Sequence, residues 1–404
     1  MPGKKTIWSV GGGKGGVGKS IATANIGCAL AQRGNKVILV DADLGGANLH
    51  TYFGIRHPEK GLDDFLKGRA GSLEDTALET EVKGLRLITG GGEFLGIANP
   101  AFAQKQRLLS HIKKLEADFI LVDLGAGSTY NILDFFAVSN EGIVVLVPEP
   151  AAIQNAYIFL KSFVYRRLQR LFAENEGISR MVRDATDARS GSSVKTFSDL
   201  CEKIASKDRE AAKSAITEIK SFRPKVLLNM AATKADLKVV DAFRSASNTF
   251  LGLETDYIGV LYSRPSVKAA ARRMRPFMCD KTADDAHRDM GVIIESLLKA
   301  EGKEPLVRPI PQKEDAAHVQ EVFGFNDNVS HGGAVYHVQT EVQGGGLPSI
   351  ETIIYCGGRI YFSKKSLWND IAEANGGLEI KDYATRQHRA AMAAIKMDKI
   401  TLKG

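Results

Sequence analysis

The sequence has few cysteines and no cysteine motif. Its 404 residues include four, Cys28, Cys201, Cys279 and Cys356, which lie far apart and form no C-x-x-C pair. A disulfide framework or a local zinc or iron–sulfur motif would need closely spaced cysteines. We therefore expect reduced thiols, as in cytoplasmic proteins.

The sequence also lacks a long hydrophobic run and a visible internal repeat. No apolar stretch approaches the length of about 20 residues that a membrane-spanning helix needs. The apolar part of the N-terminal segment, Thr6–Val10, is too short for a secretion signal. We expect a cytoplasmic protein, with peripheral contact at the inner membrane face as an open alternative.

Positive charge is in modest excess. The 54 Lys and Arg residues outnumber 47 Asp and Glu residues, which gives a formal net charge of +7. Such a balance permits loose attraction to nucleic acid or acidic lipid, but it is too small to select between them. With 44% hydrophobic and 25% charged residues, the composition is typical of a soluble globular protein.

Short apolar runs alternate with helical patterns as far as about residue 300. Runs such as Phe119–Val122 and Ile143–Val147 are continuously apolar, as in strands that are buried on both faces of a parallel sheet. The pattern predicts an α/β fold, a doubly wound and mostly parallel sheet. The expected strands are Thr6–Val10, Lys36–Val40, Leu85–Thr89, Asp118–Val122, Gly142–Val147, Lys225–Leu228 and Tyr257–Leu261.

Two segments depart from this alternation. Residues 173–224 are too long for a plain connection, and their apolar spacing predicts a helical insertion with a mobile tip at 187–193. Prolines and charges in 303–318 indicate a linker that follows a first domain, 1–302. In 319–404, β-type alternation around glycines and a helical pattern at Lys381–Ile400 predict a small α+β module, a β-hairpin with a helix.

A glycine-rich loop lies between the predicted strand Thr6–Val10 and a helical pattern, Lys19–Arg33. This strand-loop-helix context is the one that a phosphate-binding loop requires, because loop N–H groups and the helix N-terminus then converge on phosphate oxygens. Lys19 would contact the β- and γ-phosphates, and the Ser20 hydroxyl would bind Mg²⁺. The loop consists of Gly13-Lys14-Gly15-Gly16-Val17-Gly18-Lys19-Ser20.

The second lysine of this loop, Lys14, is not needed for its curvature. With it, the loop resembles the deviant Walker A motif of the MinD/ParA family of P-loop ATPases, in the SIMIBI class. In that family the corresponding lysine reaches across an ATP-bound dimer to the partner's phosphates. The resemblance implies that Lys14 stabilises transition-state charge in trans, as an arginine finger does, so that hydrolysis needs a homodimer.

Other segments extend the resemblance. Asp43 matches the switch I aspartate that lies near Mg²⁺ and the attacking water, with Asp41 and Asn48 as supporting groups. Asp123 matches the Walker B aspartate and would hold Mg²⁺, and the glycines that follow it would change shape when the γ-phosphate leaves. Asn229, at the end of a predicted strand, matches the asparagine that reads the adenine edge.

The resemblance therefore implies ATP and Mg²⁺ as cofactors and a weakly active ATPase. The catalytic residues would be Lys14, Lys19 and Asp43, and the Mg²⁺ ligands Ser20, Asp43 and Asp123. The nucleotide-binding residues would be Gly13, Gly15, Gly16, Val17, Gly18, Lys19, Ser20, Ile21 and Asn229.

Within the family, three segments are similar to the flagellar-number regulators FlhG and FleN, namely Asp43–Leu49, Pro148–Tyr157 and Val267–Phe277. This implies an ATP-driven dimerisation switch that positions or counts a structure such as a flagellum, a division site or a cargo, with an unknown protein partner. Two alternatives stay open. One is a metal-cluster carrier of the Mrp or nitrogenase iron protein branch, and the other is a nucleotide-binding regulatory scaffold.

The remaining features are two segments rich in basic residues and a group of two histidines and a cysteine. The C-terminal helical pattern is expected to pack on the β module, with a membrane surface as the alternative. His331, His337 and Cys356 lack a metal-binding spacing, so we assign no metal to them. A basic cluster near the end of the first domain is a solvated helix face or a weak contact for DNA or anionic membrane. It comprises Arg264, Lys268, Arg272, Arg273 and Arg275.

Overall fold

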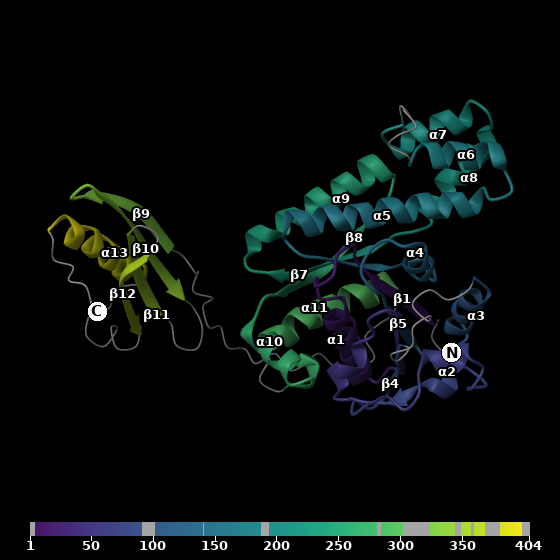
Figure 1. Ribbon diagram of the computed structural model, residues 1–404, viewed down its shortest axis with the longest axis horizontal. Coiled ribbons are helices and arrows are strands. Elements are labelled where there is room, and N and C mark those ends of the chain that lie inside the picture. The colour runs from purple at the N-terminus through teal and green to yellow at the C-terminus, as the bar shows by residue number, and fades with distance from the viewer. Residues whose placement is uncertain are drawn as a thin grey trace. The chain divides into compact units, whose positions relative to one another are not determined.

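The computed structural model divides the chain into two compact units, Met1–Pro309 and Ile310–Gly404 (Figure 1). It describes residues 5–90, 102–139, 141–186, 194–280, 284–301, 324–343, 349–356, 359–367 and 380–397. The predicted linker, 303–318, and the predicted domain limits at 302 and 319 lie outside these residues.

An eight-stranded sheet forms the centre of the first unit, in the order β3-β4-β2-β5-β1-β6-β7-β8. All neighbours pair in parallel except β3, which is antiparallel to β4. The mostly parallel sheet confirms the predicted fold class. Its strands are β1 (Thr6–Gly11), β2 (Val37–Asp41), β3 (Leu78–Glu79), β4 (Leu85–Ile88), β5 (Phe119–Asp123), β6 (Ile143–Leu146), β7 (Lys225–Ala231) and β8 (Asp256–Tyr262).

Helices cover both faces of the sheet, and alternate strand residues enter the two cores. In β2, Ile38 and Val40 belong to one core, and Val37 and Leu39 to the other. The first core lies under α2 (Leu62–Leu66), α3 (Phe102–Ile112), α4 (Tyr130–Phe136), α5 (Pro150–Leu171) and α9 (Lys238–Leu251). The second lies under α1 (Lys19–Gln32), α10 (Pro265–Arg272) and α11 (Asp284–Ala300).

The described residues of 173–224 form three helices at the far end of α5 (Figure 1). They are α6 (Glu176–Asp184), α7 (Phe197–Ala205) and α8 (Arg209–Lys220). Their N-termini are capped by Asn175, Thr196 and Asp208. Their apolar side chains join the same core as α5, so these helices extend the first core. The predicted tip, 187–193, lies outside the described residues.

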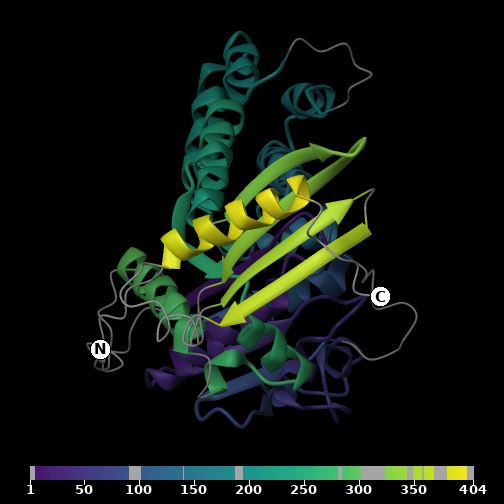
Figure 2. The same ribbon diagram turned by 90° about the vertical axis from the view of Figure 1, so that its left-hand side faces the viewer.

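The second unit is an antiparallel sheet in the order β12-β11-β10-β9, crossed on one face by α13 (Ile380–Lys396) (Figure 2). The expected hairpin, β10 (Ala334–Gln343) with β11 (Ser349–Cys356), is thus half of a larger sheet that also holds β9 (Gly324–His331) and β12 (Arg359–Leu367). β9 was missed because its sequence is polar and contributes Val329 alone to the cores of this unit as a fully buried side chain among the described residues.

The buried face of α13 packs on this sheet, as expected for the C-terminal helix. Ala384 lies in one small core with Val342 and Ile350, and Ile395 lies in another with Val338 and Ile354, which are both on the sheet. None of the described helices has the length and apolar character that crossing a membrane requires.

Candidate functional site

Glycines bend the loop between β1 and α1 where side chains would not fit. Gly16 and Gly18 have φ angles of 80° and 87°, which favour glycine. A Cβ atom on Gly13 would lie 1.9 Å from the backbone oxygen of Asn155 in α5, and one on Gly18 would lie 2.2 Å from Nδ2 of Asn229. The loop is thus wedged between the start of α5 and the end of β7. Gly18 at the N-cap of α1 makes no side-chain cap hydrogen bond, and an uncapped helix N-terminus is suited to bind an anion.

The two lysines of this loop have different surroundings. Lys19 is buried, and its Nζ donates to the backbone oxygen of Lys14 at 3.3 Å. Burial lowers the pKa of Lys19, while the charges of Asp123 and Asp43 oppose this shift. The side chain of Lys14 is 42% exposed and forms an ion pair with Glu149 at 3.3 Å. One lysine therefore belongs to the interior of the loop and the other to the surface.

Asp123, at the end of β5, is tied to the first turns of α1. Its Oδ2 accepts a hydrogen bond from Ser20 Oγ at 2.6 Å, and its Oδ1 accepts one from Thr23 Oγ1 at 2.9 Å. Burial raises the pKa of Asp123 to about 6, and the two hydroxyl groups oppose this shift. The structure thus brings together Ser20 and Asp123, which were predicted to share a Mg²⁺ site.

Asp41 is the last residue of β2, and Asp43 lies two residues beyond the end of this strand. Asp41 is fully buried and accepts hydrogen bonds from the backbone N–H groups of Asp43 at 3.2 Å and Leu49 at 2.9 Å, so it braces the segment between them. Burial raises its pKa to about 8, and the charge of Asp123 adds to this shift. The carboxylate of Asp43 lies against Gly125, where a Cβ atom would be 2.8 Å from Oδ1.

These residues fit a magnesium ion held beside a phosphate group. Asp41, Asp43 and Asp123 share one region with the cation of Lys19, as their mutual effects on pKa indicate. Burial raises the pKa values of Asp41 and Asp123, and neighbouring carboxylates add to the rise, so a divalent cation beside them would stabilise their ionised forms. Mg²⁺ commonly takes one or two carboxylates and completes its shell with phosphate oxygens and water. A hydroxyl with acidic side chains beside an anion cradle matches that preference.

Asn229 lies within β7 and is buried. Its Nδ2 donates to the backbone oxygen of Val17 at 2.8 Å, so its amide supports the glycine-rich loop. The next residue, Met230, is 40% exposed and has a φ angle of 57°. Contact between Asn229 and an adenine base stays a prediction.

The other predicted residues lie in the same loop or beside it. A Cβ atom on Gly15 would be 3.7 Å from Cβ of Ala126, so the loop adjoins the segment after β5. Gly127 in that segment has a φ angle of 97°. Ile21 packs against the second core, and Asn48 donates from Nδ2 to the backbone oxygen of Gly46 at 2.7 Å.

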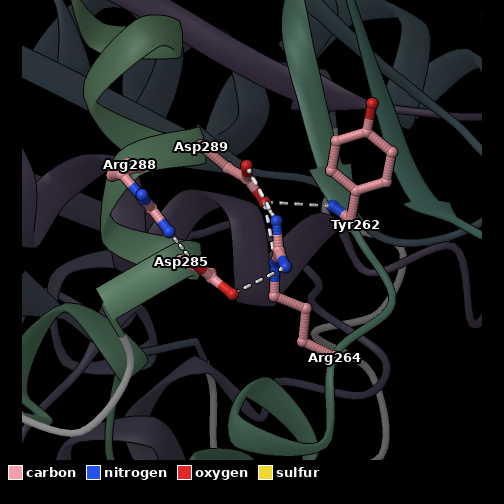
Figure 3. A network of polar contacts seen from close by, with 5 residues as sticks. All are labelled: Tyr262, Arg264, Asp285, Arg288 and Asp289. Atoms are coloured by element: carbon pink, nitrogen blue, oxygen red, sulfur yellow. Dashed lines mark hydrogen bonds and ion pairs between the residues drawn. The ribbon is translucent and has the colours of Figure 1, made fainter. Parts of the chain in front are cut away.

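Arg264, the first member of the predicted basic cluster, is engaged in a polar network (Figure 3). Its guanidinium donates to Asp289 at 3.0 Å and to Asp285 at 3.2 Å, both in α11. Asp289 also accepts from the backbone N–H of Tyr262 at 3.4 Å, and Asp285 pairs with Arg288. The network ties the end of β8 to α11, and the charge of Arg264 is neutralised within it.

The rest of the basic cluster divides into two pairs. Arg273 and Arg275 each form an ion pair with a carboxylate. Lys268 and Arg272 have no carboxylate partner within the described part of the chain. A shallow hollow of about 340 Å³ is lined by Pro265, Lys268, Ala269, Arg272 and Arg273. Contact with DNA or anionic membrane stays a prediction.

The structure also identifies site residues that the sequence analysis missed. Thr23 lies one helical turn after Ser20, and this spacing could have identified it as a second hydroxyl on the same face of α1. The backbone of Asn155 against Gly13 has no sequence signal. His337 contacts Asn328 at 2.8 Å.

Curated relatives match part of the chain. The flagellum site-determining protein YlxH of Helicobacter pylori is 39% identical over 151 residues, which are 37% of this chain and 50% of that protein. The antiactivator FleN of Pseudomonas aeruginosa is 32% identical over 157 residues, which are 38% of this chain and 55% of that protein. The chain thus spans about half the length of these relatives.

Among solved structures, the cell division ATPase MinD of Pyrococcus furiosus covers 74% of this chain and 100% of its own, with 20% identity and a TM-score of 0.49. The family model described as the CobQ/CobB/MinD/ParA nucleotide binding domain matches residues 8–317. Because this match includes the loop, the three carboxylates and well over half of the sequence, the chain belongs to the CobQ/CobB/MinD/ParA family of nucleotide-binding domains.

Proposed function

We propose that this chain is an ATPase that binds ATP with Mg²⁺, dimerises around it and uses the cycle to position or count a cellular structure. The observation that carries the proposal is the pair of lysines in one loop. Lys19 lies in the interior, whereas Lys14 is at the surface with Glu149 as its ion partner. An exposed lysine beside a phosphate cradle is suited to neutralise charge in a second protomer.

The residues of the site would have different roles in ATP hydrolysis. Bound Mg²⁺–ATP supplies the reactive γ-phosphoryl group and the charge of the metal ion. The loop N–H groups and Lys19 would bind the phosphates, and Ser20 and Asp123 would hold the metal ion. Asp43, which lies against Gly125, would orient the attacking water.

Lys14 would contribute to the partner's site instead of its own. In the single chain, Glu149 holds it at 3.3 Å, and both side chains are substantially exposed. Such a pair is weak, because water screens its charges. Lys14 can therefore leave Glu149 at small cost when a partner's phosphates offer a stronger anion.

The biological role is inferred from the names of the relatives. They are a flagellum site-determining protein, an antiactivator and, in Thermotoga maritima, a septum site-determining protein that is 33% identical over 147 residues. Such a switch controls its partner protein if the partner binds the ATP-bound dimer with higher affinity than the monomer.

Metal-cluster carriage is the second candidate. An iron–sulfur cluster carrier protein of Aquifex aeolicus is 30% identical over 162 residues. Anaerobic reconstitution with iron and sulfide distinguishes the two functions. Stable binding of iron with a cluster absorption spectrum would favour the carrier, and protein that stays colourless would favour the switch.

The mass of the protein with and without nucleotide tests the proposal. We expect the full chain to be monomeric alone and dimeric with Mg²⁺ and a slowly hydrolysed ATP analogue, as measured by light scattering. Lys14→Ala should dimerise poorly, and its rate of phosphate release should fall by roughly a thousandfold or more, as when an arginine finger is removed. Lys36→Ala, which alters another exposed lysine, is the control and should behave as wild type. A mass that does not respond to nucleotide would refute the dimerisation switch.

A further inference from the structure

Two cysteines that are far apart in the sequence meet in the first unit. Cys28 lies in the middle of α1, and Cys279 ends the short 3₁₀ turn Phe277–Cys279 that follows α10. Their Sγ atoms are 3.9 Å apart, in hydrogen-bonding contact, across a sequence separation of 251 residues. Cys28 is fully buried and Cys279 is partly exposed.

Polar contacts on both sides of the pair fix it in place. Asn25 Oδ1 accepts from the backbone N–H of Met278 at 2.9 Å, and Gln32 Nε2 donates to the backbone oxygen of Met278 at 2.9 Å. Positions 25, 28 and 32 share one face of a helix. The 3₁₀ turn is therefore held on α1 both before and after Cys28, so the approach of the two sulfur atoms is part of the packing.

The two thiols differ in chemical character. The hydrogen bond with Cys28 lowers the pKa of Cys279, burial opposes this effect, and the guanidinium of Arg275 lowers the pKa further. Burial raises the pKa of Cys28 well above its ordinary value, and the contact with Cys279 adds to this. Because the thiolate is the reactive form, Cys279 is the nucleophile and Cys28 is the thiol beside it.

We propose that Cys28 and Cys279 are a modification site at which peroxide forms a reversible disulfide. The Cys279 thiolate attacks one peroxide oxygen, the O–O bond breaks, and the sulfur becomes a sulfenic acid as hydroxide leaves and takes up a proton. The Cys28 sulfur then attacks the sulfenic sulfur, and its proton leaves with the hydroxyl group as water. Two thiols thus lose two electrons and two protons, and one peroxide becomes two waters.

The geometry permits this bond after a small movement. A disulfide has an S–S distance of about 2.0 Å, so the two sulfur atoms must approach by about 2 Å. The bond would join the helix that begins at the phosphate loop to the segment that follows α10. This inference goes beyond the proposed ATPase cycle and does not depend on it.

Peptide mapping of the full chain after peroxide treatment tests the proposal. We expect the loss of two free thiols, a cross-linked peptide pair that contains Cys28 and Cys279, an upward shift of Tm, and reversal of all three by dithiothreitol. Cys279→Ser should abolish the cross-link, and because its side chain is partly exposed this variant should fold.

Cys201→Ala is the matched control for a buried cysteine. Burial raises the pKa of Cys201 to about 11, so its thiol should stay reduced and its loss should leave the cross-link unchanged. The proposal is overturned if the cross-link is absent while Cys279 proceeds to sulfinic acid. It is also overturned if Cys279 pairs as readily with a second chain or with another cysteine.

Discussion

Asp123 connects more parts of the site than any other side chain described above. It accepts hydrogen bonds from Ser20 and Thr23 on α1, and its charge affects the pKa values of Lys19 and Asp41. These links join the ends of β2 and β5 to the first turns of α1. At the scale of residues, the site is a group of buried carboxylates linked to the first turns of α1.

The pKa shifts of two carboxyl groups predict how stability depends on pH. Burial raises the pKa of Asp123 to about 6 and that of Asp41 to about 8. A raised carboxyl pKa means that the folded protein favours the protonated form. Each protonated carboxyl group therefore contributes fully to stability below the unfolded pKa near 4. The contribution of Asp123 is lost as pH rises through about 6, and that of Asp41 as pH rises through about 8.

We predict that the protein without nucleotide loses thermal stability between about pH 4 and about pH 8, the interval between the unfolded and folded pKa values of these two carboxyl groups. Saturating Mg²⁺–ADP should reduce this loss, because a bound cation stabilises the ionised carboxylates. Scanning calorimetry across pH, with and without Mg²⁺–ADP, measures both effects. If Tm does not change over this pH range in the absence of ligand, ionisation of Asp41 and Asp123 does not destabilise the folded protein as we predict.

At the scale of elements, the phosphate-binding loop packs against α5. The backbone of Asn155 leaves no space for a side chain at Gly13, and the residue before α5 is Glu149, the ion partner of Lys14. The far half of the same helix packs against α6 and α8. One helix therefore contacts both the loop and the helices of 173–224.

Gly13→Ala should abolish nucleotide binding while the protein stays folded. The new methyl group would lie 1.9 Å from a backbone oxygen of α5, so the loop must move away from its binding shape. Gly291→Ala is the matched control, because a Cβ atom there meets nothing within 4 Å and helix propensity favours alanine by about 1 kcal/mol. Calorimetric titration with Mg²⁺–ADP compares the two variants. If Gly13→Ala binds Mg²⁺–ADP with wild-type affinity, the close packing of the loop on α5 is not required for nucleotide binding.

The sequence predicted the elements of the first unit better than the contacts between them. Strands such as Phe119–Asp123 were predicted within a residue or two, because continuous apolar runs followed by an acid or a glycine are local signals. The short strand β3 and the polar strand β9 lack such a signal and were missed. Pairing of Asn229 with Val17, or of Cys28 with Cys279, depends on packing between distant segments, which no local pattern encodes.

At the scale of the whole molecule, the site belongs to the first unit, which the family match covers from residue 8 to its end, and the second unit has its own small cores around α13. The proposed ATPase site involves two molecules, because Lys14 would complete the site of a partner. Closed two-fold dimers are the commonest form of soluble oligomer, and in such a dimer each protomer would supply one lysine to the other.

Mixing two inactive variants tests whether Lys14 acts on the phosphates of the partner chain. Lys14→Ala retains Asp43, and Asp43→Ala retains Lys14. If Lys14 acts in trans, a mixed dimer contains one complete site, and an equal mixture should recover up to about a quarter of wild-type phosphate release, as random pairing of two-fold dimers predicts. Each variant alone should stay inactive. If the mixture releases no more phosphate than the separate variants, Lys14 serves its own chain and the account of a shared site is wrong.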